Sequence, residues 1–135
     1  MTSEMIRVPV AWGEVLDKLT ILQIKSERIL DPVKQINIRR EHDLLTEVIE
    51  AYGGLGEVAP GIMGQLKVVN GQLWEVEDSL RDCEASQNFD AHFIELARSV
   101  YRLNDERFRL KRRLNELLGS PLIEEKSYGR VDEPS

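Results

Sequence analysis

One long amphipathic stretch, residues 89–119, limits the possible folds of this chain more than any other feature. Its apolar residues recur every three or four positions, which places them on one stripe of an α-helix. They are Phe89, Phe93, Leu96, Val100, Leu103, Leu110, Leu114 and Leu118. The stretch ends at Gly119, and the following Ser120 and Pro121 prevent the helix from continuing. A helix with such a stripe packs it on a core made by other helices.

Three polar residues interrupt this apolar stripe. Asn104, Arg107 and Lys111 follow the spacing i, i+3, i+7, so they share the face on which a core helix would carry leucines. Burial of an unpaired ion is strongly disfavoured. We therefore expect these side chains to be paired, hydrated or bound to a ligand. This polar insertion is the main functional clue in the sequence.

Three further helices are predicted from the same kind of periodicity. The four predicted helices span residues 12–30, 32–52, 62–84 and 90–118. The predicted fold is all-α: an antiparallel four-helix bundle that forms a single domain over residues 1–135. A short extended N-terminal segment is expected before the bundle, and a loose C-terminal tail, residues 120–135, is expected after it.

The predicted helix boundaries rest on residues with strong local preferences. Asp31 followed by Pro32 is a start signal for the second helix, and Asp90 is expected to cap the fourth. The glycine-rich residues 53–61 predict a mobile loop. Apolar residues alternate over residues 6–10, which predicts a short extended segment that leads into the first helix.

The helix predicted at residues 12–30 is apolar on two sides. One side carries Trp12, Val15, Leu16, Leu19, Leu22 and Leu30, and the opposite side carries Ile21 and Ile24. A helix that is apolar on two sides is usually covered on both. We therefore expect it to lie at the centre of the bundle or half within a subunit interface.

The second and third predicted helices each have one apolar face. In the second it is made by Leu44, Leu45, Val48, Ile49 and Tyr52. In the third it is made by Ile62, Leu66, Val69, Leu73, Val76, Leu80 and Cys83, with Asn70 and Glu77 along one edge. Gly64 and Gly71 lie on the outer side, where a mid-helix glycine costs ~1 kcal/mol relative to alanine. Such a cost suggests either that another helix approaches closely there or that the helix simply tolerates the glycines.

Charge and composition narrow the range of partners. A net charge of −6 and a pI near 5.0 exclude a general affinity for nucleic acid, which needs a basic face. No run approaches the ~18 apolar residues of a membrane span, so no membrane association is expected. The single cysteine, Cys83, cannot form an intrachain disulfide. We expect a cytoplasmic protein that needs no cofactor.

Seven polar residues are predicted to face the core or line a pocket. They are Asp17, Arg28, Glu41, Glu77, Asn104, Arg107 and Lys111. Glu41 is the predicted acidic counterpart of Arg107. In one interpretation these residues form an internal network of ion pairs and amides that fixes the helix register. In the other, Arg107 and Lys111 bind a carboxylate or a phosphate.

Three blocks of the sequence resemble one known family. They are VPVAWGEVLDKLTILQIKSERI at residues 8–29, LWEVEDSLRDCE at residues 73–84 and FIELARSVYRLNDERFRLKRRLNELLGSPLIEEKSY at residues 93–128. These blocks are similar to short bacterial and phage proteins catalogued as a domain of unknown function. The resemblance spans most of the chain and implies a single domain. It implies no activity and no catalytic residue.

A second, looser resemblance concerns carboxylates. Two acidic pairs fit the ExxE…ExxD pattern of the all-α nucleoside triphosphate pyrophosphohydrolases, whose clustered acids hold Mg²⁺. They are Glu47 and Glu50, then Glu75 and Asp78. Both pairs point away from the predicted apolar faces, so they could share an ion only if the outer faces of two subunits met. This pattern implies Mg²⁺ as a cofactor in that alternative alone.

The predicted function is a non-catalytic helical interaction module, expected to be a homodimer and to bind a protein partner. The first alternative is a pocket for a small anionic molecule around Arg107 and Lys111. The segment DKLTILQIKSER, residues 17–28, resembles the first helix of the all-helical chorismate mutases, so this pocket would be mutase-like. The second alternative is the Mg²⁺-dependent nucleotide pyrophosphohydrolase.

Overall fold

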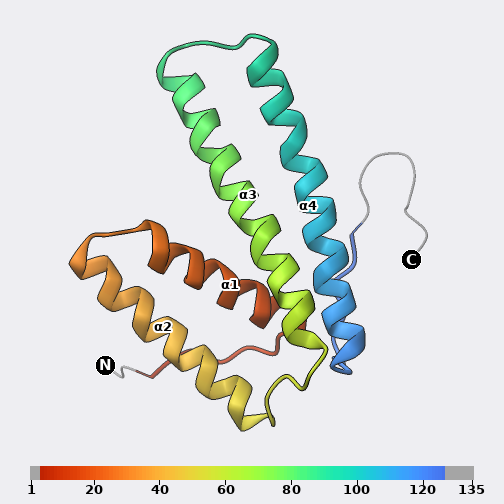
Figure 1. Ribbon diagram of the computed structural model, residues 1–135. Coiled ribbons are helices and arrows are strands. Elements are labelled where there is room, and N and C mark those ends of the chain that lie inside the picture. The colour runs from red at the N-terminus through yellow and green to blue at the C-terminus, as the bar shows by residue number, and fades with distance from the viewer. Residues whose placement is uncertain (1–3, 127–135) are drawn as a thin grey trace.

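Four helices make up the regular structure of this chain. The computed structural model describes residues 4–126, which contain no β-strand. The helices are α1 (Trp12–Arg28), α2 (Pro32–Ala51), α3 (Ala59–Ala85) and α4 (Ala91–Leu117). The helices pack against one another, so the predicted all-α fold is confirmed (Figure 1). Within residues 4–126, no helix is both long enough and apolar enough to cross a membrane.

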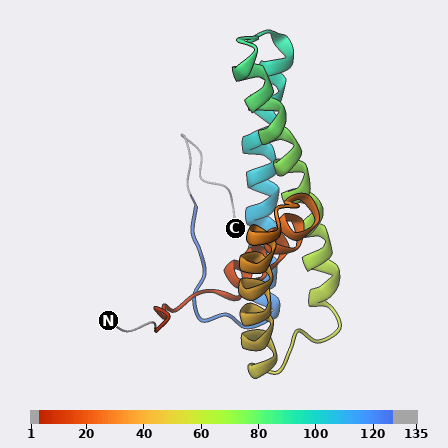
Figure 2. The same ribbon diagram turned by 90° about the vertical axis from the view of Figure 1, so that its left-hand side faces the viewer.

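The helices are arranged as two hairpins that cross. α1 and α2 form the shorter hairpin, which lies across the lower part of the longer α3–α4 hairpin (Figure 1). α1 packs directly against each of the other three helices, whereas α2 packs directly against α1 alone. The two apolar sides of α1 are therefore both covered, and α1 holds the central position predicted as one of two alternatives. Figure 2 shows that the upper halves of α3 and α4 extend beyond the crossing.

The predicted start and stop signals act as expected. The Asp31 carboxylate accepts hydrogen bonds from the backbone N–H groups of Val33 and Lys34, at 2.9 and 3.2 Å. Asp90 caps α4 in the same way, and its carboxylate accepts from the N–H groups two and three residues later. Gly119 has a φ of +66°, the left-handed conformation that ends a helix. These caps satisfy backbone groups that a helix leaves without partners at its ends.

Two predicted boundaries were wrong by a few residues. α1 ends at Arg28 instead of residue 30 because Ile29 is already extended, and Leu30 is consequently 80% exposed outside the core. α3 begins at Ala59, within the predicted loop at residues 53–61. Pro60 lies in its first turn, where the missing N–H group of proline costs nothing.

The hydrophobic core lies where the hairpins cross. Leu16, Leu66 and Leu114 are fully buried there, one each from α1, α3 and α4. α2 contributes less than predicted, because it packs on a single helix. Ile49 is buried, but Tyr52 is 75% exposed and only reaches the edge of the core through its ring contact with Trp12.

The α3–α4 hairpin has an outer half, residues 71–85 and 91–104, which we call the arm. Cys83 is the one buried residue in the arm. The apolar residues that join its two helices are only half-buried. They are Leu73, Val76, Leu80, Phe93, Leu96, Val100 and Leu103. The arm is therefore a two-helix layer without the third element that a core needs.

The C-terminal segment, residues 120–126, lies along α4 and is called the strap below. The hydroxyl of Ser120 accepts a hydrogen bond from the backbone N–H of Trp12 at 3.3 Å, and Lys126 Nζ lies 2.6 Å from Asp105 Oδ1. Arg112 and Glu125 form a longer contact of 3.5 Å. The first part of the predicted loose tail is thus held on the surface of α4. The rest of that tail lies outside the described residues.

Candidate functional site

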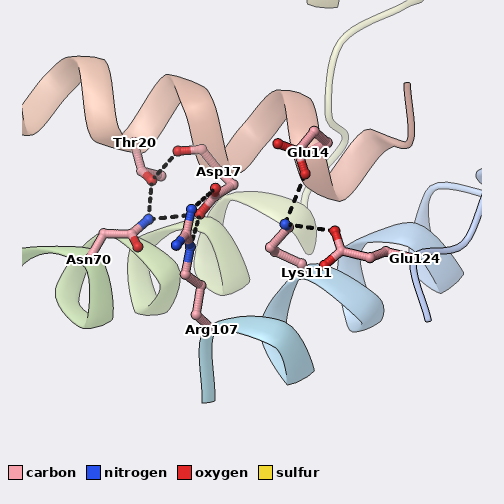
Figure 3. Close-up of polar contacts among 7 residues, drawn as sticks. All are labelled: Glu14, Asp17, Thr20, Asn70, Arg107, Lys111 and Glu124. Atoms are coloured by element: carbon pink, nitrogen blue, oxygen red, sulfur yellow. Dashed lines mark hydrogen bonds and ion pairs between the residues drawn. The ribbon is translucent and has the colours of Figure 1, made fainter. Parts of the chain in front are cut away.

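A buried ion pair lies at the centre of the crossing. Asp17 of α1 is 2% exposed, and both of its carboxylate oxygens accept hydrogen bonds from Arg107 of α4 (Figure 3). Arg107 Nε lies 2.9 Å from Oδ1, and Nη2 lies 2.5 Å from Oδ2. This bidentate geometry is the strongest form of the pair. The hydrogen bonds to Asp17 raise the pKa of Arg107 above its usual value, so the guanidinium group stays charged.

One amide group, from Asn70, and one hydroxyl group, from Thr20, complete the environment of Asp17. Asn70 of α3 donates through Nδ2 to Asp17 Oδ1 and to Thr20 Oγ1, both at 2.9 Å. The Thr20 hydroxyl in turn donates to the backbone carbonyl of Asp17 at 2.7 Å. Every buried side-chain nitrogen and oxygen in the described residues has a partner. Three helices are therefore tied together by one satisfied network, which fixes their relative register.

A second ion pair lies one helical turn further along α4. The side chain of Lys111 is 11% exposed, and its Nζ lies 2.9 Å from Glu14 Oε2 and 3.0 Å from Glu124 Oε2 (Figure 3). Burial by itself lowers the pKa of Lys111, but the hydrogen bonds to Glu14 and Glu124 outweigh burial and raise it. The ammonium group therefore joins α1, α4 and the strap while it remains charged.

Gly13 allows α1 to approach α4 this closely. A Cβ atom at this position would lie 2.4 Å from the backbone carbonyl oxygen of Lys111. The Gly13 N–H donates to Asn115 Oδ1 at 2.6 Å, and Asn115 is 2% exposed. A glycine at the start of α1 thus sets the distance across which Glu14 reaches Lys111.

Replacement of Gly13 by alanine is expected to lower the free energy of unfolding by about 1–3 kcal/mol, because the new methyl group would push against backbone. Thermal unfolding followed by circular dichroism measures this effect. Gly64→Ala is the matched control, since nothing lies within 4 Å of that Cβ position, and it is expected to stabilise by up to ~1 kcal/mol. An equal effect of both substitutions would contradict the close approach at Gly13.

The structure separates the seven predicted polar residues. Asp17, Arg107 and Lys111 lie together at the crossing, and Asn104 lies beside them on α4. Arg28 instead forms an exposed ion pair with Glu75. Glu41 and Glu77 lie away from the crossing network, on α2 and on α3.

Glu41 is not the partner of Arg107. Its carboxylate lies 2.8 Å from Lys18 Nζ in an exposed pair between α1 and α2. The prediction placed Glu41 in line with an apolar residue of its own helix, but α2 makes no direct contact with α4. Glu77 lies half-buried in the arm, and the described structure records no hydrogen bond or ion pair for it.

Sequence reasoning did not select several residues of this site. They are Gly13, Glu14, Thr20, Asn70 and Asn115. The sequence contained a signal for two of these residues, Asn70 and Thr20. Asn70 occupies the edge of the apolar stripe of α3, and Thr20 lies one turn from Asp17 on α1. Both are polar residues in otherwise apolar positions, the same signal that drew attention to Arg107.

An open groove of about 630 Å³ lies between α4 and the strap, next to the two ion pairs. It is lined by Val100, Tyr101, Asn104, Asp105, Arg107, Phe108, Lys111, Glu124, Glu125 and Lys126. The groove thus combines three cations, three carboxylates and two aromatic rings. Arg107 and Lys111 connect it to the buried network.

The four acidic residues proposed as magnesium ligands do not form a cluster. Glu47 and Glu50 lie on α2, whereas Glu75 and Asp78 lie on α3, and these two helices do not pack against each other. Glu75 is held by Arg28. Residues 4–126 contain no group of three or more histidine, cysteine, aspartate or glutamate side chains that could hold a metal ion.

Comparisons with known proteins identify a family but no activity. A family model with the description "Family of unknown function (DUF6165)" matches residues 6–135. No curated protein and no solved structure matches the chain. The geometry described above is therefore the basis for any assignment of function.

Proposed function

The chain belongs to DUF6165, a family of unknown function, and we propose that it acts as a helical interaction module that pairs with a second copy of itself through the arm. The observation that carries this proposal is the incomplete layer formed by residues 71–85 and 91–104. The apolar residues between its helices remain half-buried because no third helix covers them. A second arm laid over the first would complete a four-helix layer.

The charges of the arm favour one way of pairing. On α3, residues 74–85 carry five carboxylates and one arginine, so this half of the arm is acidic. On α4, residues 91–104 carry Arg98 and Arg102 and a single carboxylate, Glu95, with which both arginines pair, so this half of the arm has a net charge of +1. A two-fold arrangement that lays α3 of one copy over α4 of its partner brings opposite charges together. Pairing of α3 with α3 would bring ten carboxylates together, two sets of five, and is disfavoured.

Exposed apolar groups on α4 supply contact area for such a dimer. Ile94 is 56% exposed and Tyr101 is 55% exposed, and their spacing of seven residues places them on one face. Arg98 lies between them on that face. Hydrogen bonds with Arg98 and Arg102 hold the pKa of Tyr101 below its usual value, and the Arg102 guanidinium carbon lies 6.0 Å from the centroid of the Tyr101 ring. Tyrosine and arginine are enriched at protein interfaces.

The buried network fits the same role. Asp17, Arg107 and Asn70 satisfy one another without a bound ligand, and they join α1 to both helices that continue into the arm. An ion-pair network of this kind fixes register more than it adds stability. The crossing would then be a rigid base from which the arm is presented.

The test is the oligomeric state, measured by analytical ultracentrifugation over a range of concentrations. Arg98→Glu with Arg102→Glu changes the net charge of the α4 half of the arm from +1 to −3, and Asp78→Lys with Asp82→Lys and Glu84→Lys changes that of the α3 half from −4 to +2. Each variant alone is expected to be monomeric where the wild-type protein is dimeric. An equimolar mixture of the two is expected to dimerise again, because each reversed face meets a complementary one.

The matched control is Lys34→Glu with Arg39→Glu, an equal change of charge on the exposed side of α2, which should leave the dimer intact. Wild-type protein that stays monomeric up to its solubility limit would refute the proposal. A dimer that survives both arm variants would place the interface elsewhere and would refute it equally.

A further inference from the structure

We infer that the groove between α4 and the strap is a binding site for a small organic carboxylate, and that Glu124 occupies its anion position in the free protein. The groove lies mostly below the arm, and Tyr101 is the residue that it shares with the exposed face assigned to the proposed dimer. The inference rests on three features of the groove: open donors on its floor, a carboxylate that is easily displaced, and a partly apolar wall.

The floor of the groove presents hydrogen-bond donors that the buried network does not use. Arg107 binds Asp17 through Nε and Nη2, and the described structure records no bond for its Nη1. Asn104 lines the groove half-buried, and no hydrogen bond is recorded for its amide within residues 4–126. Lys111 has three N–H donors and two carboxylate partners. All three residues line the groove.

Glu124 holds Lys111 in a way that a ligand could replace. Lys111 is paired twice, once with Glu14 from α1 and once with Glu124 from the strap. The Glu124 side chain is 48% exposed, so its release restores contact with water at small cost. A ligand carboxylate in its place would leave the charge around Lys111 unchanged.

The surrounding charges select a singly charged anion. Asp17 already neutralises Arg107, and Glu14 already neutralises Lys111. Asp105 and Glu125 also line the groove, but Lys126 lies 2.6 Å from Asp105 and Arg112 lies 3.5 Å from Glu125. A second negative charge on the ligand, as in a phosphate dianion, would therefore find no uncompensated cation among the described lining residues, whereas one carboxylate replaces one carboxylate.

Part of the remaining wall of the groove is apolar or aromatic. Val100, Tyr101 and Phe108 line this part. A volume of about 630 Å³ lies within the range of small-molecule sites. The site therefore fits a molecule with one carboxylate and an apolar or aromatic body.

The experiment is titration of the 135-residue chain with benzoate, followed by NMR chemical shifts of Tyr101 and Phe108 and by calorimetry. Glu124→Gln is expected to bind benzoate about fivefold (~1 kcal/mol) more tightly than the wild-type protein, because the internal competitor is gone. Glu125→Gln, which removes the neighbouring carboxylate that contacts Arg112 instead of Lys111, should leave the affinity unchanged.

Three further measurements decide the inference. Benzamide, the neutral analogue, and acetate, which lacks the ring, should both bind more weakly than benzoate. Lys111→Met should abolish binding, and its circular dichroism spectrum shows whether it is folded. Equal affinity of the wild-type protein and Glu124→Gln would overturn the inference, as would benzamide binding as tightly as benzoate. Because Tyr101 belongs to both surfaces, these titrations are made at a protein concentration at which the proposed dimer is dissociated, and the dimer itself is tested by the charge reversal of the arm.

Discussion

Replacement of Arg107 by methionine is expected to lower the free energy of unfolding by about 3–5 kcal/mol, the largest effect of any single polar substitution in this protein. The reason is the position of its partner. Asp17 is 2% exposed, and without the guanidinium group its charge would stay buried with only Asn70 to stabilise it. Urea denaturation at neutral pH gives the free energy directly.

The partner substitution, Asp17→Asn, is expected to cost less, about 1–3 kcal/mol. The Arg107 side chain is 30% exposed, so its guanidinium group can be solvated by water when Asp17 is replaced. An asparagine at position 17 can still accept a hydrogen bond from Asn70. The double variant should lose less than the sum of the two single losses, because the buried charge and its partner are removed together. Strict additivity would show that the two side chains are not coupled.

An exposed ion pair supplies the matched control for both variants. Arg28→Met removes an arginine that also pairs with a carboxylate, but on the surface, where both side chains are more than 40% exposed. Its loss is expected to cost at most ~1 kcal/mol. If Arg28→Met were as destabilising as Arg107→Met, burial of Asp17 would not be the cause of the effect.

Truncation of Leu66 to alanine is expected to cost about 2–5 kcal/mol, because this fully buried side chain would leave a cavity at the crossing. Leu80→Ala, the same change on the same helix, is expected to cost only about 1–2 kcal/mol because Leu80 is half-buried in the arm. Both variants should be compared by chemical denaturation at a low protein concentration, at which the proposed dimer is dissociated.

Amide hydrogen exchange measures the difference in stability between the crossing and the arm independently. Backbone amides near Leu66 should exchange through global unfolding, whereas those near Leu80 should exchange through lower-energy opening of the arm. Equal costs for the two truncations, with equal protection of the two regions, would mean that the arm is as well packed as the crossing. The proposal of an uncovered arm would then lose its main support.

Much of the helical structure could be predicted from local sequence alone. Asp31 and Asp90 start helices and Gly119 ends one, because each of these residues acts on backbone groups within a few positions of itself. The periodic apolar residues placed Leu16, Leu66 and Leu114 on buried faces for the same reason. The period of a helix is a local property, so its buried face can be read without knowledge of its neighbours.

The candidate site could be predicted only in part, because its cations and the partners of those cations depend on different kinds of information. Arg107 and Lys111 stood out because they are polar residues on an apolar stripe. Their partners could not be assigned in the same way. Glu41 and Asp17 are both acids that could have met Arg107, and the choice depends on which helix lies against α4.

The sequence by itself determined that this chain forms four helices, where most of them begin and end, and that one of them carries cations into an apolar face. The tertiary structure alone decided that the two hairpins cross, that Asp17 is the partner of Arg107, and that the arm is left uncovered. The physical reason is that helix periodicity specifies faces, whereas crossing angles depend on how side chains of distant segments fit together. Gly13 illustrates this dependence, because its missing side chain has meaning only against the backbone of Lys111.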